Sequence, residues 1–339
     1  MQERERINSR PADKVCAKVC VDRLRVASLW KLELWNVRTL RGDGKTEMLA
    51  RALARQGVDV CGLCETRWQE ESEMVVDDPD GDQKYKLWIG AGLTGIGGVG
   101  VAVRESVARC LEKWKAVSSR VGVLRLRGTP VGVSVVVAYA PVEDAEDAKK
   151  DEFYSEISVV VAGERESGRA VVTIGDFNAR VGPAVDGEKG VVGKWALGIR
   201  NDNGRRLVNL AWETGLSIAS SMFRKKCRRV TWLPLGKTRK DAVQLDHVLV
   251  QSRWRTAVRD VESRWGAEVD SDHALVVAKV GLRLRAGGCG KKVKQVPWEE
   301  GANLTECGFE VEIRNRFAPL AELGASEVNE CSGKQERQQ

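Results

Sequence analysis

Short apolar runs alternate along the chain with polar segments that contain glycine, asparagine or aspartate. Runs of this kind, rich in Val, Ile and Leu and bounded by turn-forming residues, are typical of β-strands. Many strands with few helices between them predict two packed sheets flanked by helices. The runs that predict strands cover residues 32–36, 58–64, 98–103, 121–126, 131–139, 171–174, 216–220, 229–232, 244–250, 258–263 and 274–280.

Three segments show helical spacing instead. Residues 45–56 place apolar side chains on one face and end before Gly57, a residue type that commonly terminates helices. Residues 203–213 have a similar apolar face and end before Gly215. Residues 144–162 are expected to form the third helix.

The predicted helices and strands fall within residues 29–282, which we interpret as one α/β domain. Residues 1–28 are charged, show little periodicity and are expected to be a disordered leader. Residues 283–339 are expected to be a linker-like tail. This tail begins with a glycine-rich linker at 286–292 and contains a short helix around 309–323.

Composition narrows the class of protein. The chain has a formal net charge of +7 and a pI of about 8.9, which suits a polyanionic partner. Its nine cysteines are odd in number and unevenly spaced, which is typical of reduced intracellular thiols. No apolar run reaches membrane-spanning length, and the first residues are too charged for a secretory signal. These features predict a soluble protein of the nucleus or the cytosol, without membrane association.

Residues with catalytic potential stand at the ends of the apolar runs. Asp176 and Asn178 follow one run, and His273, one of only two histidines, precedes another. A carboxylate, an amide and an imidazole at strand ends are the groups needed for metal-assisted attack on a phosphate. Strand ends converge at one rim of a sheet, although each such residue taken singly is also a common turn former. The same position at a run end is shared by Asn36, Glu65, Asp246 and Asp272.

Six segments, in order along the chain, resemble the endonuclease/exonuclease/phosphatase superfamily. They are residues 34–38, 64–68, 137–141, 174–180, 244–250 and 271–273. The combination of Gly175-Asp176-Phe177-Asn178 with Ser271-Asp272-His273 is highly specific. The sequences Trp35-Asn36-Val37-Arg38-Thr39-Leu40 and Glu65-Thr66-Arg67-Trp68 are closest to the endonuclease domains of non-LTR retrotransposons and to craniofacial development protein 2-like proteins derived from them. The Tyr-x-Asp-Asp motif of a reverse transcriptase does not occur.

The resemblance implies a four-layer α/β sandwich, with two packed mixed or antiparallel sheets flanked by helices. It also implies that a monomer hydrolyses DNA phosphodiester bonds with Mg²⁺, leaving 3′-OH and 5′-phosphate ends. In the metal site, Glu65 would bind Mg²⁺, with Mn²⁺ as the alternative, because hard cations prefer carboxylate oxygens. Asn36 would position the metal or the phosphate, and Asp272 would add negative charge nearby.

The resemblance also assigns catalytic roles. Asp176 would orient and deprotonate the attacking water, and Asn178 would hold the nucleophile or the phosphate. His273 would donate to a non-bridging phosphate oxygen, with its ring oriented by Asp246. Tyr139 would hydrogen-bond the phosphate.

One departure from the family pattern follows Asn36. Some relatives carry an acidic residue just after this asparagine, where it helps to bind metal. Here Val37 and Arg38 occupy that place, so we expect no second metal ligand there.

Other motifs have two interpretations. The segment 42–46 resembles the end of a P-loop, but the first glycine of that motif would fall at Thr39, so a loop before a helix is expected. Cys61 and Cys64 have zinc or redox spacing, but no second pair stands at zinc-ribbon distance and a buried strand is expected. Trp232, near the expected site, could stack on DNA. A basic cluster is expected either to contact nucleic acid or direct nuclear import, or to form a solvated loop; it comprises Arg224, Lys225, Arg228 and Arg229.

Two alternative functions remain open. One is a phosphatase of the same fold that acts on phosphoinositides or nucleotides, and the basic cluster and the retrotransposon-like segments argue against it. The other is a catalytically inactive, domesticated module that binds DNA or protein. The presence of every catalytic carboxylate argues against this second alternative.

Overall fold

The computed structural model describes residues 29–284, apart from residues 82, 93–96, 225–227, 235, 239 and 267–270. The expected leader at 1–28, the linker at 286–292 and the helix at 309–323 lie outside the described residues. In the part of the chain that is described, no helix combines the length and apolar character needed to cross a bilayer.

Seven strands form the first sheet, in the order β13-β14-β1-β2-β5-β4-β3. β1 and β2 run parallel, and every other neighbouring pair is antiparallel. Both faces of β2 are buried, as expected for a strand that is covered on two sides. The bounds are β1 Trp30–Asn36, β2 Val60–Cys64, β3 Ser72–Asp77, β4 Lys84–Ile89, β5 Val99–Arg104, β13 Val258–Arg264 and β14 Leu275–Val280.

Six strands form the second sheet, in the order β11-β12-β10-β9-β7-β6. β9 and β10 run parallel, and the other neighbouring pairs are antiparallel. The bounds are β6 Leu111–Ala116, β7 Val121–Leu126, β9 Val133–Tyr139, β10 Ala170–Asp176, β11 Leu216–Ile218 and β12 Asp246–Gln251. A small separate ladder joins β8 (Gly128–Thr129) to β15 (Arg283–Leu284).

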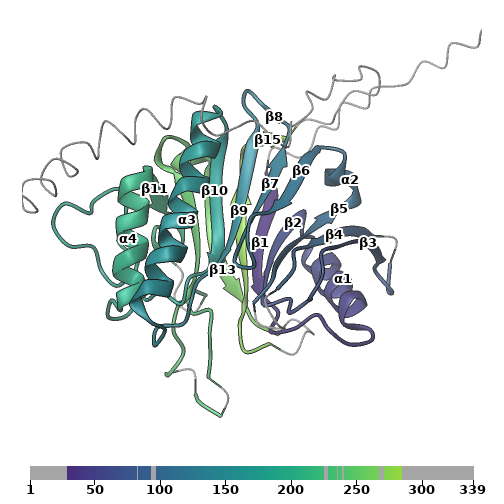
Figure 1. Ribbon diagram of the computed structural model, residues 1–339, viewed down its shortest axis with the longest axis horizontal. Coiled ribbons are helices and arrows are strands. Elements are labelled where there is room, and N and C mark those ends of the chain that lie inside the picture. Colours follow the sequence, from purple (N-terminus) through teal and green to yellow (C-terminus); the bar gives the residue numbers. More distant parts are fainter. Residues whose placement is uncertain are drawn as a thin grey trace, which may run out of the picture. The chain divides into compact units, whose positions relative to one another are not determined.

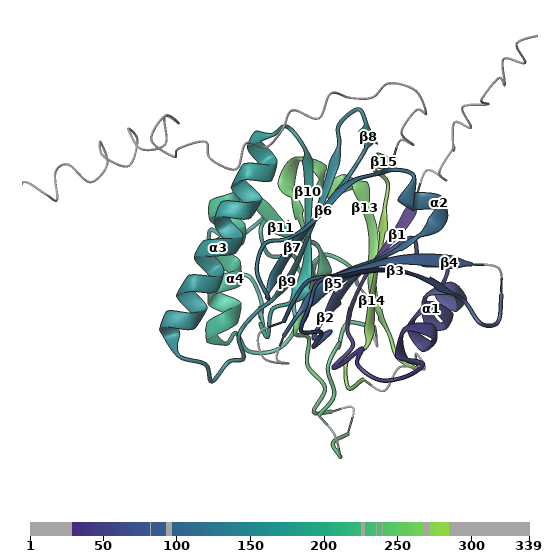
Figure 2. The same cartoon turned by 45° about the vertical axis from the view of Figure 1, so that its right-hand side comes forward.

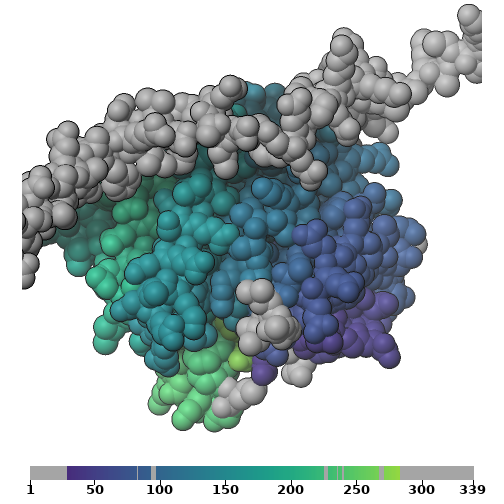
Figure 3. Space-filling view, viewed as in Figure 1, coloured from purple at the N-terminus to yellow at the C-terminus, as the bar shows by residue number. Residues whose placement is uncertain are grey.

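The longer helices cover the outer faces of the two sheets. α1 (Lys45–Gln56) packs on the first sheet, and α3 (Asp147–Glu166) and α4 (Asp202–Thr214) pack on the second (Figure 1). The same separation is visible after a 45° turn (Figure 2) and in the space-filling view, where purple and blue residues lie on one side and teal and green residues on the other (Figure 3). The predicted four-layer sandwich is therefore confirmed. Short helices complete the connections: α2 (Glu105–Ala108), η1 (Ala219–Ser221) and η2 (Ser252–Ala257).

The layer between the sheets is a continuous apolar core. Leu34 and Val60 of the first sheet belong to the same buried cluster as Val137 and Ile174 of the second. At Gly62, an added Cβ would lie 2.6 Å from Cδ1 of Ile174. Glycine at this position therefore allows the two sheets to pack closely at the middle of β2.

Both sheets contain the same four-strand arrangement. A central parallel pair has one antiparallel neighbour on each side, as β14-β1-β2-β5 in the first sheet and β12-β10-β9-β7 in the second. The carboxyl ends of the parallel strands and the amino ends of β12 and β14 consequently lie at the same edge. There Asp176 stands in register with Tyr139 on β9 and with Asp246 on β12.

Most predicted elements are present, but several bounds differ. The helix predicted at 45–56 matches α1, whereas the helix predicted at 144–162 begins at Asp147 and ends at Glu166. Residues 229–232 do not form a strand, and within this segment Trp232 makes isolated bridges to Val243 and His273. β3, β4 and β6 have no counterpart among the predicted strands. The folded region also continues past residue 282, because β15 pairs with β8.

Candidate active site

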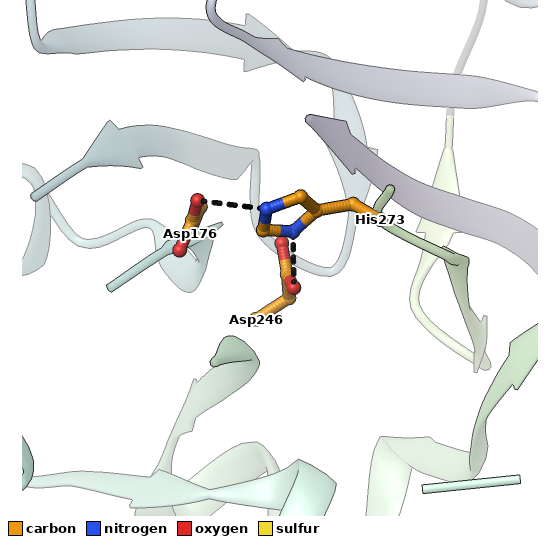
Figure 4. A group of neighbouring side chains, drawn as sticks. All are labelled: Asp176, Asp246 and His273. Carbon is orange, nitrogen blue, oxygen red and sulfur yellow. Dashed lines mark hydrogen bonds and ion pairs between the residues drawn. The ribbon is translucent and has the colours of Figure 1, made fainter. Parts of the chain in front are cut away.

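Three buried side chains from different strands meet at this common edge. Asp176 ends β10, Asp246 begins β12, and His273 lies just before β14. Nδ1 of His273 is 3.0 Å from Oδ2 of Asp246, and its Nε2 is 3.8 Å from Oδ2 of Asp176. The ring therefore lies between two carboxylates (Figure 4), and the contact predicted between His273 and Asp246 is present.

Burial and mutual charge shift the protonation of this group. Burial alone would lower the pKa of His273, but the carboxylates of Asp246 and Asp176 raise it to about 9. Burial raises the pKa of Asp176 to about 7, and the charge of Asp246 adds to this effect against the opposing influence of His273. A carboxyl group that titrates near neutrality suits a general base, and a cationic imidazole suits a donor to a phosphate oxygen.

Glu65 stands beside this centre, directly after β2, and three donors hold its carboxylate. Nδ2 of Asn36 donates to Oε1 of Glu65 at 2.8 Å and to Oδ2 of Asp176 at 2.9 Å. The hydroxyl of Tyr139 donates to the same oxygen of Glu65 at 3.0 Å. Nη2 of Arg67 donates to the other oxygen, Oε2, at 2.7 Å. Glu65 is thereby fixed next to Asp176 at the cleft floor.

These contacts show how Asn36 and Tyr139 are held. Asn36 turns its amide nitrogen towards the carboxylates while its oxygen accepts the N–H of Arg38 at 3.0 Å, so it holds the two acidic residues. Tyr139 donates to Glu65, and the roles of both residues towards a metal ion or a phosphate stay predictions. Burial raises the pKa of Tyr139, so the hydroxyl keeps the proton that it donates. Neighbouring carboxylates repel one another, and shared donors of this kind reduce that repulsion.

Asp272 lines the same cleft as Glu65 and Asp176. Its Oδ2 accepts the indole N–H of Trp232 at 3.0 Å, and Nε of Arg38 lies 3.6 Å from its Oδ1. Asp272 thus links Trp232 to Arg38 in the lining of the cleft, while its buried Oδ1 makes no hydrogen bond. Its role in adding charge beside the metal stays a prediction.

The site opens into a cleft of about 610 Å³. Among the described non-glycine residues, four have a left-handed backbone, and all four line this cleft: Arg38 (φ 54°), Glu65 (φ 55°), Arg67 (φ 58°) and Asn178 (φ 48°). Strained backbone of this kind concentrates at functional sites. The chain turns directly after Asp176, where the N–H of Asn178 donates to Oδ1 of Asp176 at 3.0 Å.

Two residues of the centre, Thr231 and Ser271, were not predicted from the sequence to be functional. Their hydroxyl groups bond to the backbone of the site residues. Oγ1 of Thr231 accepts the N–H of Asp246 at 3.1 Å. Oγ of Ser271 donates to the carbonyl of Asn36 at 2.6 Å and accepts the N–H of His273 at 3.1 Å. Ser271 lies within residues 271–273, one of the segments that carry the family resemblance. That resemblance was the sequence feature that could have identified it. Thr231 lies in a segment with no comparable local pattern.

The donor set at this edge fits a divalent metal ion. In the described part of the chain, ligand atoms of Asp176, Asp246 and His273 all lie within 4.8 Å of one another, and Glu65 is connected to Asp176 through Asn36. Oδ1 of Asp246 is buried and makes no hydrogen bond, so one carboxylate oxygen is unsatisfied. Clustered carboxylate oxygens are the ligands that Mg²⁺ and Mn²⁺ prefer.

The predicted nucleic-acid-binding residues divide between two places. Trp232 lines the catalytic cleft, whereas Arg228 and Arg229 line a separate cleft of about 860 Å³. Nη1 of Arg228 lies 3.1 Å from a buried glutamate, and the guanidinium of Arg224 lies 5.3 Å from the centre of a tryptophan ring. Lys225 lies outside the described residues. These arginines have contacts within the fold, and their contact with DNA stays a prediction.

The remaining motifs are structural. Gly44 adopts a left-handed conformation (φ 75°) at the start of α1, as expected for a loop that leads into a helix. Cys61 belongs to the core under α1 and Cys64 to the core between the sheets, so the two thiols lie on opposite faces of β2. Burial raises the pKa of both thiols, and this pair cannot share a metal ion from opposite faces.

Comparison with known proteins identifies the family. Residues 34–273 match the endonuclease/exonuclease/phosphatase family, and the chain belongs to it. It is 30% identical to craniofacial development protein 2 of Bos taurus over 291 residues and to that of Tragulus javanicus over 253 residues. These alignments cover 85% and 74% of this chain but 47% and 42% of the relatives, so the chain spans less than half of their length.

Solved structures with the same fold come from several organisms. The 3′ phosphatase NExo from Neisseria, bound to a product DNA hairpin, is 19% identical with a TM-score of 0.55. The AP endonuclease LMAP from Leishmania major is 15% identical, also with a TM-score of 0.55. Both matches cover 74% of this chain, and they cover 99% and 87% of the respective structures. At these identities the likeness shows the shared fold.

Proposed function

We propose that this protein is a Mg²⁺-dependent endonuclease that hydrolyses DNA phosphodiester bonds in the nucleus and derives from a retrotransposon endonuclease. The observation that carries the proposal is the buried pair of His273 and Asp246, which faces Asp176 across 3.8 Å in the cleft. Family membership and the net charge of +7 support a polyanionic phosphodiester substrate. An AP endonuclease and a phosphatase bound to DNA are among the structural neighbours.

Each residue of the centre has a distinct task in this mechanism. Asp176 takes the proton of the attacking water, because a pKa near 7 leaves much of the carboxyl group ionised at neutral pH. Cationic His273 donates to a non-bridging phosphate oxygen as negative charge builds, and Asp246 keeps its ring oriented. A metal ion held by Glu65 would supply Lewis-acid polarisation of the phosphate.

The first test is plasmid nicking with and without Mg²⁺. We expect the wild-type protein to convert supercoiled DNA to open circles only with the metal, and Glu65→Gln to abolish detectable nicking while circular dichroism stays unchanged. His273→Ala should reduce the rate on the order of 100- to 1000-fold, as typical for loss of one donor to a developing oxyanion. Glu70→Gln, at an exposed position five residues further on, is the matched control and should retain full activity.

The outcomes separate the proposals. Full activity of Glu65→Gln at ordinary Mg²⁺ would remove Glu65 from the metal site. Release of inorganic phosphate from nucleotides or phosphoinositides, without nicking, would favour a phosphatase. Binding of DNA without any hydrolysis would favour an inactive module.

A further inference from the structure

Two of the four strained residues of the cleft are arginines without a task in the mechanism above. Arg38 and Arg67 each follow a site residue by two positions, Asn36 and Glu65 respectively, and each has a left-handed backbone. Such a backbone lowers stability in a residue with a long side chain and persists where its surroundings fix it. Here the N–H of Arg38 donates to Oδ1 of Asn36 at 3.0 Å, and the N–H of Arg67 donates to the carbonyl of Gly97 at 2.9 Å.

Both guanidinium groups lie in the cleft against a carboxylate. Arg38 pairs with Asp272 at 3.6 Å, and Arg67 pairs with Glu65 at 2.7 Å. The arginine side chains are 39% and 42% exposed. Ion pairs at this exposure contribute little to folding, so they do not explain why strained backbone is kept at both positions. Binding of a ligand in the cleft by both arginines would explain why the strained backbone is kept.

The two carboxylates that hold the arginines lie on either side of β1. Glu65 follows β2, Asp272 precedes β14, and β1 lies between these strands in the sheet. The strands next to which they lie are two strand spacings apart, roughly 10 Å. Groups that far apart cannot grip one phosphate together, but they can each bind a different phosphate of the same DNA strand. A guanidinium is well suited to this, since it binds phosphate with two parallel hydrogen bonds.

We propose that Arg38 and Arg67 form a phosphate clamp, in which each arginine binds one DNA phosphate on either side of the phosphate that is cleaved. The proposal rests on the proposed endonuclease function and deepens it. Each guanidinium exchanges a carboxylate of the protein for a phosphate of the substrate. The exchange also explains how a cleft that contains Glu65, Asp176 and Asp272 admits a polyanion.

The test is the salt dependence of single-turnover nicking in Mg²⁺, with the protein in excess over a labelled duplex. Arg38→Gly and Arg67→Gly remove the charge and also relieve the left-handed backbone. We expect each variant to raise the half-saturating protein concentration and to flatten its dependence on log salt by about 0.9, and the double variant by about twice that. The melting temperature of each variant should be no lower than that of the wild type.

Three further variants complete the design. Arg38→Lys and Arg67→Lys keep the charge and should largely restore the salt slope. Arg55→Gln is the matched control, because Arg55 is also an exposed arginine paired with a carboxylate, at 2.9 Å from Asp80, but it lies on α1 and does not line the cleft. It should leave the slope unchanged.

The failures can be told apart. Unchanged slopes in the glycine variants, with nicking intact, overturn the clamp and leave the endonuclease in place. A fall in melting temperature with unchanged half-saturation assigns the arginines a structural role and also overturns the clamp. A wild-type protein that does not nick DNA overturns both proposals.

Discussion

The pKa values of Asp176 and His273 are both higher than the ordinary values of these residue types. The proposed mechanism needs Asp176 ionised and His273 protonated. Asp176 accepts a proton only when ionised, so activity should be lost as the pH falls through about 7. His273 donates only when protonated, so activity should be lost as the pH rises through about 9. We therefore expect a bell-shaped profile of kcat/KM for nicking. A bound cation stabilises the ionised carboxylate, so the acidic limb should lie at or below pH 7.

Two variants test which residues titrate in the two limbs of the pH profile. Asp246→Asn removes the carboxylate that most raises the pKa of His273, so the basic limb should move to lower pH. His247→Gln should leave both limbs in place, because His247 is buried away from the cleft and contacts Ser220 at 2.9 Å and the carbonyl of Ala179 at 2.8 Å. A basic limb that does not move in Asp246→Asn would show that another group titrates there.

The sequence indicates which residues lie together in the site, but it does not indicate the orientation of their side chains. Asp176 and His273 are recognisable from their position at run ends, because strand ends converge at one edge of a sheet. The orientation of Asn36 depends on Arg38 and Glu65 together, and that of Asp272 depends on the indole of Trp232, 40 residues away. Contacts of this kind depend on the completed fold and leave no local pattern.

At the scale of elements, the parallel pairing of β9 and β10 depends on Gly175. A Cβ at this position would lie 2.2 Å from the carbonyl oxygen of Ala138, a backbone atom that cannot move without disturbing the ladder. We expect Gly175→Ala to lower the free energy of unfolding by about 1–3 kcal/mol and to displace the adjacent Asp176, with loss of nicking. Urea unfolding and the nicking rate measure the two effects.

Gly163 provides the control for this substitution. It lies in α3, and a Cβ there would meet no atom within 4 Å. Gly163→Ala should raise the free energy of unfolding by about 0.5–1 kcal/mol, because alanine favours the helix, and should not change nicking. Equal effects of the two substitutions on the free energy of unfolding would show that the close approach at Gly175 does not determine stability.

Elements were predictable where burial leaves a clear pattern. α1, α4 and β7 combine strong apolar patterns with glycine or polar ends, and their bounds agree closely with the predictions. β3 was missed because only Val76 among its six residues is buried, as expected for an edge strand. Residues 229–232 were predicted to be a strand, but in this segment Trp232 makes only isolated bridges, to Val243 and His273, and no ladder forms.

At the scale of the whole molecule, the described sandwich should fold without the flanking residues. Its elements run from β1 to β15, and the indole of Trp30 donates to the carbonyl of Leu282 at 2.7 Å, which ties the two ends of this region together. We expect a fragment of residues 29–289 to unfold cooperatively at the same temperature as the full chain and to retain nicking. A fragment of residues 29–245, which lacks β12 to β14, should neither fold nor nick. A clearly lower melting temperature of the longer fragment would contradict the predicted domain boundary.

The position of β14 has a consequence for the protein during its synthesis. β14 inserts between β13 and β1, so the first strand of the domain gains its antiparallel neighbour only when a segment 252 residues later is available, as the contact of Trp30 with Leu282 illustrates. Pairings so distant in sequence form late. His273 precedes β14 and reaches Asp176 only through this pairing. A nascent chain in which β14 is not yet available therefore lacks the assembled centre, and under the proposed function the capacity to cut nucleic acid arises only when β14 pairs with β1.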